Sequence, residues 1–416
     1  MPEDFFVREF PNGLTFLGQR MEHVSSAALT VAVPAGACHD PVAGQGAAAI
    51  ASEWCLRGAG EWDTRRVNDA LDSLGCQHSE SVQSEHILFS AAALGRNLPA
   101  VLDIYADILL RPRLEDSTFE SCRALVAQEL EGLEDEPMQK CGFLLRERFY
   151  PYPLGRSIYG TAESLRTVTA DIARKHVRRG LAPRGTILAV AGHIDMPKLC
   201  DQVERLLGDW RDWPPQAVET QPARGGVVHM PKDSAQVHIA MAHAAAPMSD
   251  PRYYAARLAE TVLSGGMSGR LFTEVREKRG LVYHVSTRYH SLKSHAGMFT
   301  YAATVPPKAQ TTFEVILGEL RRLGDGIEPE EILKARAQLR SALVMQGEST
   351  HARSSALCQD WYHLHRLRGL VEISDRIGKV TAEDVLEYLR EFPPRRMTFL
   401  AIGPTSPDAA AALNAQ

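Results

Sequence analysis

Cysteine pairs, long apolar runs and an excess of charge are all missing from this sequence. Its 416 residues include seven cysteines, and no two of them form a Cys-x-x-Cys pair. An odd number of scattered cysteines suits neither a disulfide framework nor a zinc knuckle. We therefore expect reduced thiols that are mostly buried.

Signals that direct a chain into or across a membrane are also missing. No run of about 18 apolar residues is present, so the sequence predicts no transmembrane helix. The segment Met1–Phe6 contains two acids where a signal peptide needs positive charge, and no apolar segment follows it. The simplest expectation is a cytoplasmic protein that has no membrane partner.

The charge balance excludes another class of protein. Lys and Arg number 46 and Asp and Glu number 51, which gives a net charge of −5. A basic nucleic-acid binder or a polybasic membrane-surface protein would carry a positive excess. No nucleic-acid partner is therefore expected.

Hydrophobic periodicity and turn residues predict strands and helices in a similar order in two halves. In the first half we expect strands at 6–10, 14–18, 27–33, 86–93 and 186–191, and helices at 44–57, 64–74, 98–110, 118–135 and 196–207. In the second half we expect strands at 237–241, 282–287, 298–304 and 397–402, and helices at 252–263, 310–323 and 329–346. Ser117 and Glu120 form a capping-box pattern at the start of helix 118–135.

A stretch rich in proline and glycine separates the two halves. We place an N-terminal domain at 1–212, a linker at 213–226 and a C-terminal domain at 227–416. The repeated order predicts an α+β fold of two homologous half-domains, each an antiparallel-rich sheet packed with helices.

Glu129 is a charged residue at an unexpected position on its predicted helix. It is spaced to share a face with Cys122, Val126 and Leu133, where an isolated carboxylate is costly. One interpretation is that Glu129 reaches out to water or pairs with an arginine of another helix. The other is that it is a metal ligand, or what remains of one.

The helix predicted at 44–57 consists largely of small residues. Glu53 has Arg57 four positions later, which is the favourable order for an ion pair on a helix surface. Read without other information, this is a closely packed helix that carries no chemistry.

The segment Ser264–Tyr283 is more informative. A glycine-rich turn leads into a short, highly charged helix, which Gly280 ends before a strand. No Gly-Lys-Ser/Thr follows the glycines, so the turn is not a phosphate-binding P-loop. Arg276 and Tyr283 are seven residues apart and can either face one cleft together or belong to a solvated helix and a half-buried tyrosine.

Taken together and in order, these segments resemble the pitrilysin/insulinase family of zinc peptidases, and the resemblance covers nearly the whole chain. Its markers are 12–14, 34–36 with 40–41, 56–58, 108–112, 129–131 with 134–137, 153–156, 159–161, 189–192 and, most specific, Ser264–Tyr283. The fold that this resemblance implies is similar to that of mitochondrial processing peptidase.

The resemblance also implies that the catalytic residues of the family are absent from this chain. The family signature is His-x-x-Glu-His, in which both histidines bind zinc and the glutamate is the general base. Aligned on Leu56-Arg57-Gly58, the two histidine positions fall on Ala49 and Glu53, and the base position falls on Ser52. The distal zinc ligand falls on Glu129, and 129 − 53 = 76 is the spacing of the family. We therefore expect no catalytic residue and no cofactor in this chain.

Members of the family hold the substrate peptide with an Arg/Tyr pair in the second half, which here corresponds to Arg276 and Tyr283. The pattern resembles the non-catalytic subunit of bacterial two-subunit members, whose partner chain carries the zinc helix. The implied partners are a homologous zinc-bearing subunit or a second copy of this chain, together with a peptide bound as an added strand at a sheet edge. The alternatives are an inactive structural or assembly protein, like the core subunits of respiratory complexes, and an enzyme whose chemistry has moved elsewhere.

Overall fold

The computed structural model describes residues 4–213 and 217–414, which form two compact units. Unit 1 contains residues 1–132, 156–220 and 345–369, and unit 2 contains residues 133–155, 221–344 and 370–416. Neither unit is continuous in sequence. The predicted division at 213–226 places most residues with their unit, but the segments 133–155 and 345–369 each belong to the unit of the other half. Residues 214–216 of the predicted linker lie outside the described residues.

Unit 1 is built on a six-stranded sheet with the order β1-β2-β8-β3-β7-β6. Its strands are β1 (Phe5–Glu9), β2 (Thr15–Arg20), β3 (Ser26–Val33), β6 (Gln77–Val82), β7 (Ile87–Leu94) and β8 (Ile187–Gly192), with a small separate pair of β4 (Gly58–Ala59) and β5 (Trp62–Asp63). Its helices are α1 (Ala47–Cys55), α2 (Thr64–Ser73), α3 (Leu98–Leu110), α4 (Asp116–Gly132), α6 (Ala162–Thr167), α7 (Ala170–Gly180), α8 (Met196–Leu207) and α12 (Thr350–Leu364).

Unit 2 is built on a five-stranded sheet with the order β11-β12-β10-β13-β9. Its strands are β9 (Val227–Pro231), β10 (Val237–Ala245), β11 (Val282–Ser291), β12 (Ala296–Thr304) and β13 (Thr398–Gly403). Its helices are α5 (Pro137–Phe149), α9 (Tyr253–Ser264), a π-helical turn η4 (Phe272–Glu277), α10 (Ala309–Arg322), α11 (Pro329–Gly347), α13 (Leu370–Lys379), α14 (Ala382–Glu391) and α15 (Ala410–Asn414).

The two sheets share one topology. In unit 1 the pairs β6/β7, β7/β3 and β3/β8 are antiparallel and β8/β2 is parallel. In unit 2 the corresponding pairs β11/β12, β12/β10 and β10/β13 are antiparallel and β13/β9 is parallel. The predicted α+β fold of two homologous half-domains is therefore confirmed, and α1 corresponds to α9.

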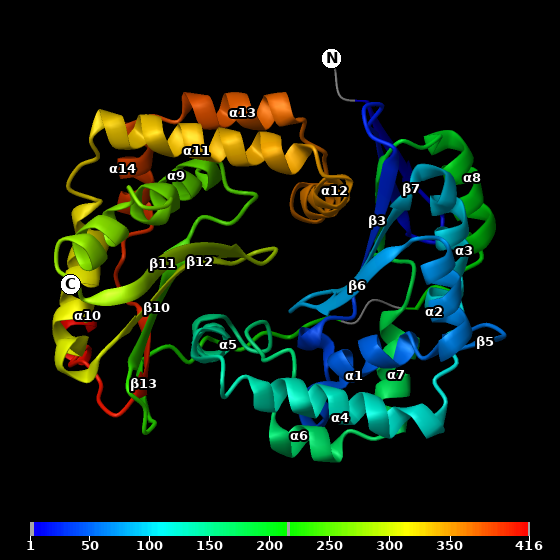
Figure 1. The fold of residues 1–416 in the computed structure, drawn as a ribbon, viewed down its shortest axis with the longest axis horizontal. Coiled ribbons are helices and arrows are strands. Elements are labelled where there is room, and N and C mark those ends of the chain that lie inside the picture. The colour runs from blue at the N-terminus through cyan, green and yellow to red at the C-terminus, as the bar shows by residue number, and fades with distance from the viewer. Residues whose placement is uncertain (1–3, 214–216, 415–416) are drawn as a thin grey trace. The chain divides into compact units, whose positions relative to one another are not determined.

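Each sheet is covered on both faces. In unit 1 the main core lies between the sheet and helices that include α3 and α8, and α12 covers the opposite face (Figure 1). Leu357 and Cys358 of α12 pack there against Leu17 and Ala189. In unit 2, Cys141 of α5 belongs to a second cluster of the same kind, on the face opposite the main core. The helix after α4 and the helix after α11 thus each cover the sheet of the other half's unit.

Each strand and helix predicted from local patterns is present within a few residues, but the bounds of α4 need a correction. The elements that were not predicted are β4, β5, β6, β9, α5, α6, α7, α12, α13, α14 and α15. Helix α4 begins at Asp116, so Ser117 lies inside it and is not the cap of a capping box. It ends at Gly132 instead of Asp135. All seven cysteines are free and buried, as expected. In the part of the chain that the structure describes, no helix is both long and apolar enough to cross a bilayer.

Candidate functional site

The first part of the site is the start of α1, which the side chain of Asp40, six residues before Gly46, caps. Gly46 precedes the helix with φ +94°, a conformation that suits glycine. The Asp40 carboxylate accepts hydrogen bonds from the N–H groups of Gly46 (2.7 Å) and Ala48 (2.8 Å), which a helix start otherwise leaves without partners. Burial raises the pKa of Asp40 to about 7, although these N–H groups and Arg156 act in the opposite direction.

Trp54 fixes α1 against α4. Its indole nitrogen donates to Thr118 Oγ1 at 2.9 Å, and its ring packs edge-to-face on Phe119 with centroids 5.1 Å apart. The indole is fully buried, so both its apolar area and its hydrogen bond hold the two helices together. The small residues of α1 also allow close packing against α7.

The structure brings together Glu53 and Glu129, the two acids predicted for this site. Arg57 donates to Glu53 Oε2 at 3.3 Å, which is the predicted ion pair of α1. Glu129 is exposed, which corrects the expectation that its side chain lies on the buried face of α4. Partial loss of water around its carboxylate, followed by the negative charge of Glu53, raises the pKa of Glu129.

Sequence reasoning missed Glu80, a third acid in the same cluster. It lies on β6, the edge strand of the sheet, which was not predicted. Burial first, and then the charges of Glu53 and Glu129, raise the pKa of Glu80. Residues 77–82 are polar except for Val82 and show no apolar alternation, so local sequence predicts neither this strand nor the place of Glu80 beside α1.

These residues do not fit a catalytic zinc ion. Such a site needs about three protein ligands and an open position for water. Ala49 has no donor atom, and Arg57 places a positive charge next to Glu53. Ser52 is buried, and its hydroxyl has no hydrogen-bond partner among the described residues. Within 4–213 and 217–414, no group of three or more His, Cys, Asp or Glu is arranged to hold a metal ion.

The second part of the site lies in unit 2, between α9 and the edge strand β11. The π-helical turn η4 carries Arg276, and Gly280 leaves the helical conformation with φ +55°. The guanidinium carbon of Arg276 lies 4.9 Å from the centre of the Tyr283 ring and 4.9 Å from that of Phe272. The helix does not continue to Tyr283; the turn at Gly280 brings the two side chains together.

A β-bulge explains the orientation of Tyr283. In the pairing of β11 with β12, Val282 is opposite Thr304 and His284 is opposite Ala303, so Tyr283 is the extra residue. Bulges re-aim the side chain at the inserted position. The Tyr283 side chain is 81% exposed, which corrects the interpretation of a half-buried tyrosine.

A buried ion pair fixes the start of this segment. Arg270 donates to both carboxylate oxygens of Glu331 on α11, at 2.7 and 2.6 Å, and to the Gly326 carbonyl at 2.8 Å. The hydrogen bond from Arg270 is the main reason that the pKa of Glu331 is lowered. Val275 is fully buried beneath η4. The ion pair of Arg270 and the buried side chain of Val275 therefore both fix the backbone that carries Arg276.

Comparison with known proteins identifies the family. Residues 16–162 match the sequence profile of Insulinase (Peptidase family M16), and residues 167–339 match that of the Peptidase M16 inactive domain. The chain belongs to the pitrilysin/insulinase family. Members similar to it include an uncharacterized zinc protease of Rickettsia felis, 26% identical and covering 97% of this chain and 98% of the relative. An uncharacterized zinc protease of Mycobacterium leprae is 27% identical, and the match covers 95% of this chain and 90% of the relative.

Two solved structures have the same fold as this chain. A peptidase M16 inactive domain from Pseudomonas fluorescens superposes with a TM-score of 0.89 at 18% identity, covering 98% of this chain and 99% of that one. A protease from Helicobacter pylori superposes with a TM-score of 0.88 at 16% identity, covering 96% and 99%. At this identity the likeness shows the fold alone.

Proposed function

We propose that this chain is a non-catalytic subunit of a zinc metallopeptidase and contributes Arg276 and Tyr283 to substrate binding. The observation that carries the proposal is the stacking of the Arg276 guanidinium on the ring of the exposed Tyr283. A structural protein gains little from holding an exposed tyrosine in a bulge above an arginine. A peptide-binding site uses both groups.

The stacking leaves the donor groups of Arg276 available. The Phe272 and Tyr283 rings lie against the guanidinium group, whose five N–H donors lie in its own plane. The Arg276 side chain makes no hydrogen bond to any other described residue; its backbone carbonyl accepts one from the Gly280 N–H at 2.9 Å. An arginine in this state can donate to a peptide carbonyl or to the oxyanion that develops during hydrolysis. The Tyr283 hydroxyl adds a second donor.

The catalytic groups must then come from a partner. Positions 49, 52 and 53 hold alanine, serine and an ion-paired glutamate, so neither this chain nor a homodimer of it supplies the His-x-x-Glu-His motif. We infer a heterodimer with a homologous chain that carries this motif and its zinc ion. The substrate is a peptide, and β6 and β11 are sheet edges that a peptide strand can extend.

The test is co-expression with a homologous chain of similar length that carries His-x-x-Glu-His and is encoded by the same genome. Each chain and the pair are assayed on a quenched fluorescent peptide. We expect activity from the pair and none from this chain alone. Arg276→Ala in the assembled pair should lower kcat by about 10²–10³-fold, which is the usual cost of losing one oxyanion donor.

Arg279→Ala is the matched control. Arg279 lies in the same segment and pairs with Glu274 at 2.7 Å instead of stacking on Tyr283, so its loss should change kcat by less than twofold. Turnover by the isolated chain that survives a chelator would instead indicate relocated chemistry. A stable but inactive pair, or one indifferent to Arg276→Ala, would indicate an assembly role and refute the proposal.

A further inference from the structure

A cavity of about 500 Å³ in unit 1 lies apart from both parts of the candidate site. It is formed by the end of α3 with the residues that follow it, by α7, and by the segment after α8. Its charged lining consists of Arg111, Arg113, Arg174, Arg178, Arg211 and one acid, Asp209. Five arginines in one cavity are a marked local departure in a chain whose net charge is −5.

Acids of the protein neutralise three of the five arginines. The pairs are Arg111 with Asp107, Arg113 with Glu115, and Arg174 with Asp116 and Asp171. These pairs hold the guanidinium groups in place around the cavity. A guanidinium has five N–H donors, so a paired arginine keeps donors for a ligand.

The other two arginines have no acidic partner. Arg178 and Arg211 form no ion pair with any residue in the described ranges. The Arg211 guanidinium carbon lies 4.8 Å from the centre of the Trp213 ring, and Trp213 also lines the cavity. Both side chains are exposed, so they are open to a ligand from solution, and their unpaired positive charge at a concave surface attracts an anion.

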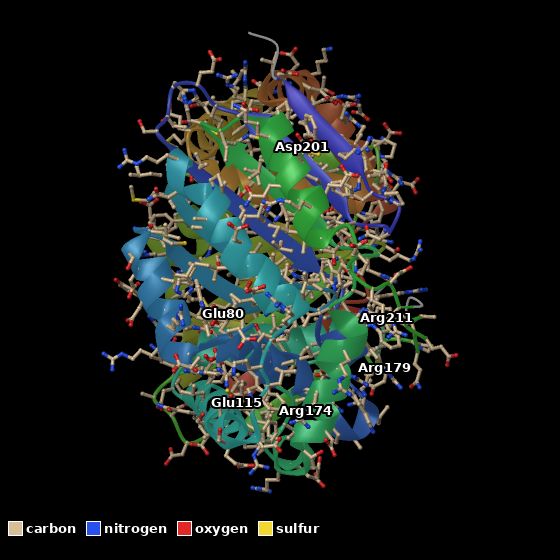
Figure 2. The ribbon with its side chains drawn as sticks, turned by 90° about the vertical axis from the view of Figure 1, so that its right-hand side faces the viewer. Glu80, Glu115, Arg174, Arg179, Asp201 and Arg211 are labelled. Carbon is tan, nitrogen blue, oxygen red and sulfur yellow. The ribbon has the colours of Figure 1, made fainter. Side chains whose placement is uncertain are left out.

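The arrangement of charge on α7 needs an explanation other than helix stability. Arg174 and Arg178 are four residues apart, as are Lys175 and Arg179, and like charges at this spacing destabilise a helix. The helix dipole favours arginines in the last turn. It does not explain why Arg113 and Arg211 reach the same cavity from other segments. Figure 2 shows Arg174, Arg179 and Arg211 in the same lower part of one face of the unit.

We propose that this cavity binds a ligand that carries two or more phosphate groups. Guanidinium groups match phosphate oxygens in a two-pronged geometry, and several of them surrounding one cavity suit a chain of phosphates better than a single one. The limited volume of this half-open cavity favours a small molecule over an extended acidic polymer. Such phosphates belong to an inorganic oligophosphate or to a nucleotide, whose base has the Trp213 ring available for stacking.

Titration calorimetry of the purified full chain tests this proposal with sodium tripolyphosphate and, separately, with ATP, both without magnesium. The variant is Arg178→Gln/Arg211→Gln. The matched control is Arg20→Gln/Arg65→Gln, which removes the same charge from exposed positions of unit 1 that do not line the cavity. We expect saturable binding that weakens as salt rises, at least tenfold weaker binding in the variant, and less than a twofold change in the control.

Comparison of the two probes assigns the source of the phosphates. Similar affinities indicate that the phosphate chain is recognised. At least tenfold tighter binding of ATP indicates a nucleotide, and Trp213→Ala should then remove the difference. Two results would overturn the proposal: no saturable binding of either probe, or equal binding by the variant and the wild type.

Discussion

Replacement of Arg270 by methionine should loosen the segment that carries Arg276 and Tyr283. Arg270 is 8% exposed and makes three hydrogen bonds, two to Glu331 and one to the Gly326 carbonyl. Methionine keeps part of the apolar stem and removes all three. The remaining carboxylate and carbonyl then lie in a partly dry environment without their donor.

The structure sets the size of the effect. Removal of one partner from a buried ion pair costs about 3–5 kcal/mol. Glu331 keeps a hydrogen bond from the Glu328 N–H at 2.9 Å, and its side chain is 27% exposed, so water can replace part of what is lost. We therefore expect Arg270→Met to lower the free energy of unfolding of unit 2 by about 2–3 kcal/mol.

The effect should depend on pH. The pKa of Glu331 is lowered in the folded protein, so the ion pair adds stability above the ordinary pKa of glutamate, about 4.3, and loses it as the pH falls. The stability difference between wild type and Arg270→Met should thus be largest near pH 7. It should narrow once the pH falls below about 4.

Hydrogen exchange followed by mass spectrometry is the suitable assay. All five tryptophans, at positions 54, 62, 210, 213 and 361, belong to unit 1, so their fluorescence does not report on unit 2. Peptides from α11 and from 265–283 should lose protection in Arg270→Met. Lys334→Met, which breaks the exposed pair with Glu330 on the same helix, should leave them close to wild type. Equal protection in Arg270→Met and wild type would refute the reasoning.

Three further results are expected. Burial raises the pKa of Cys55 and Cys358 to about 12. A thiol reagent such as DTNB should therefore react with these two thiols only after denaturant is added. Rapid reaction in the native protein would contradict their burial. Phe313→Ala should lower the free energy of unfolding by about 3–5 kcal/mol, because the ring is fully buried and packs edge-to-face on Phe399. Urea unfolding followed by circular dichroism measures this loss. A loss below about 1 kcal/mol would show that neighbouring side chains move into the space that the ring leaves. Burial lowers the pKa of His243 to about 4, so the neutral ring stabilises the fold above pH 6.5 and this contribution is lost as the pH falls toward 4. In His243→Gln the melting temperature should fall less between pH 6.5 and pH 4 than it does in the wild type. An equal fall in both proteins would show that other titrating groups cause the loss of stability.

Sequence patterns predicted elements whose periodicity reflects burial on one side. Helices 98–110 and 196–207 were placed correctly because each has a clear start, a clear end and an amphipathic face. Strand β6 and helix α12 lack such a periodicity and were missed, but so were α7, α13 and α14, although each has a clear apolar face. β6 is a polar edge strand, and α12 packs on the sheet of unit 1, which lies far from it in sequence.

In the candidate site, too, a contact within one helix was predicted, and the features that depend on strand pairing were not. The spacing of residues was enough to predict that Glu53 pairs with Arg57, because that contact is local to one helix. The exposure of Tyr283 depends on a bulge relative to β12, and the place of Glu80 depends on the pairing of β6 with β7. Such contacts depend on strand register, which no short window of sequence determines.

Because segments of the chain alternate between the two units, no single cut in the sequence separates one unit from the other. Six segments alternate, so the backbone passes from one unit to the other five times. A fragment that ends near residue 212 carries α5 but lacks the sheet that this helix covers, and it leaves the face under Leu357 bare. Cutting the gene at its midpoint therefore yields two incomplete pieces, and a protease nick in the connection at 213–226 would leave the units joined through the other crossings.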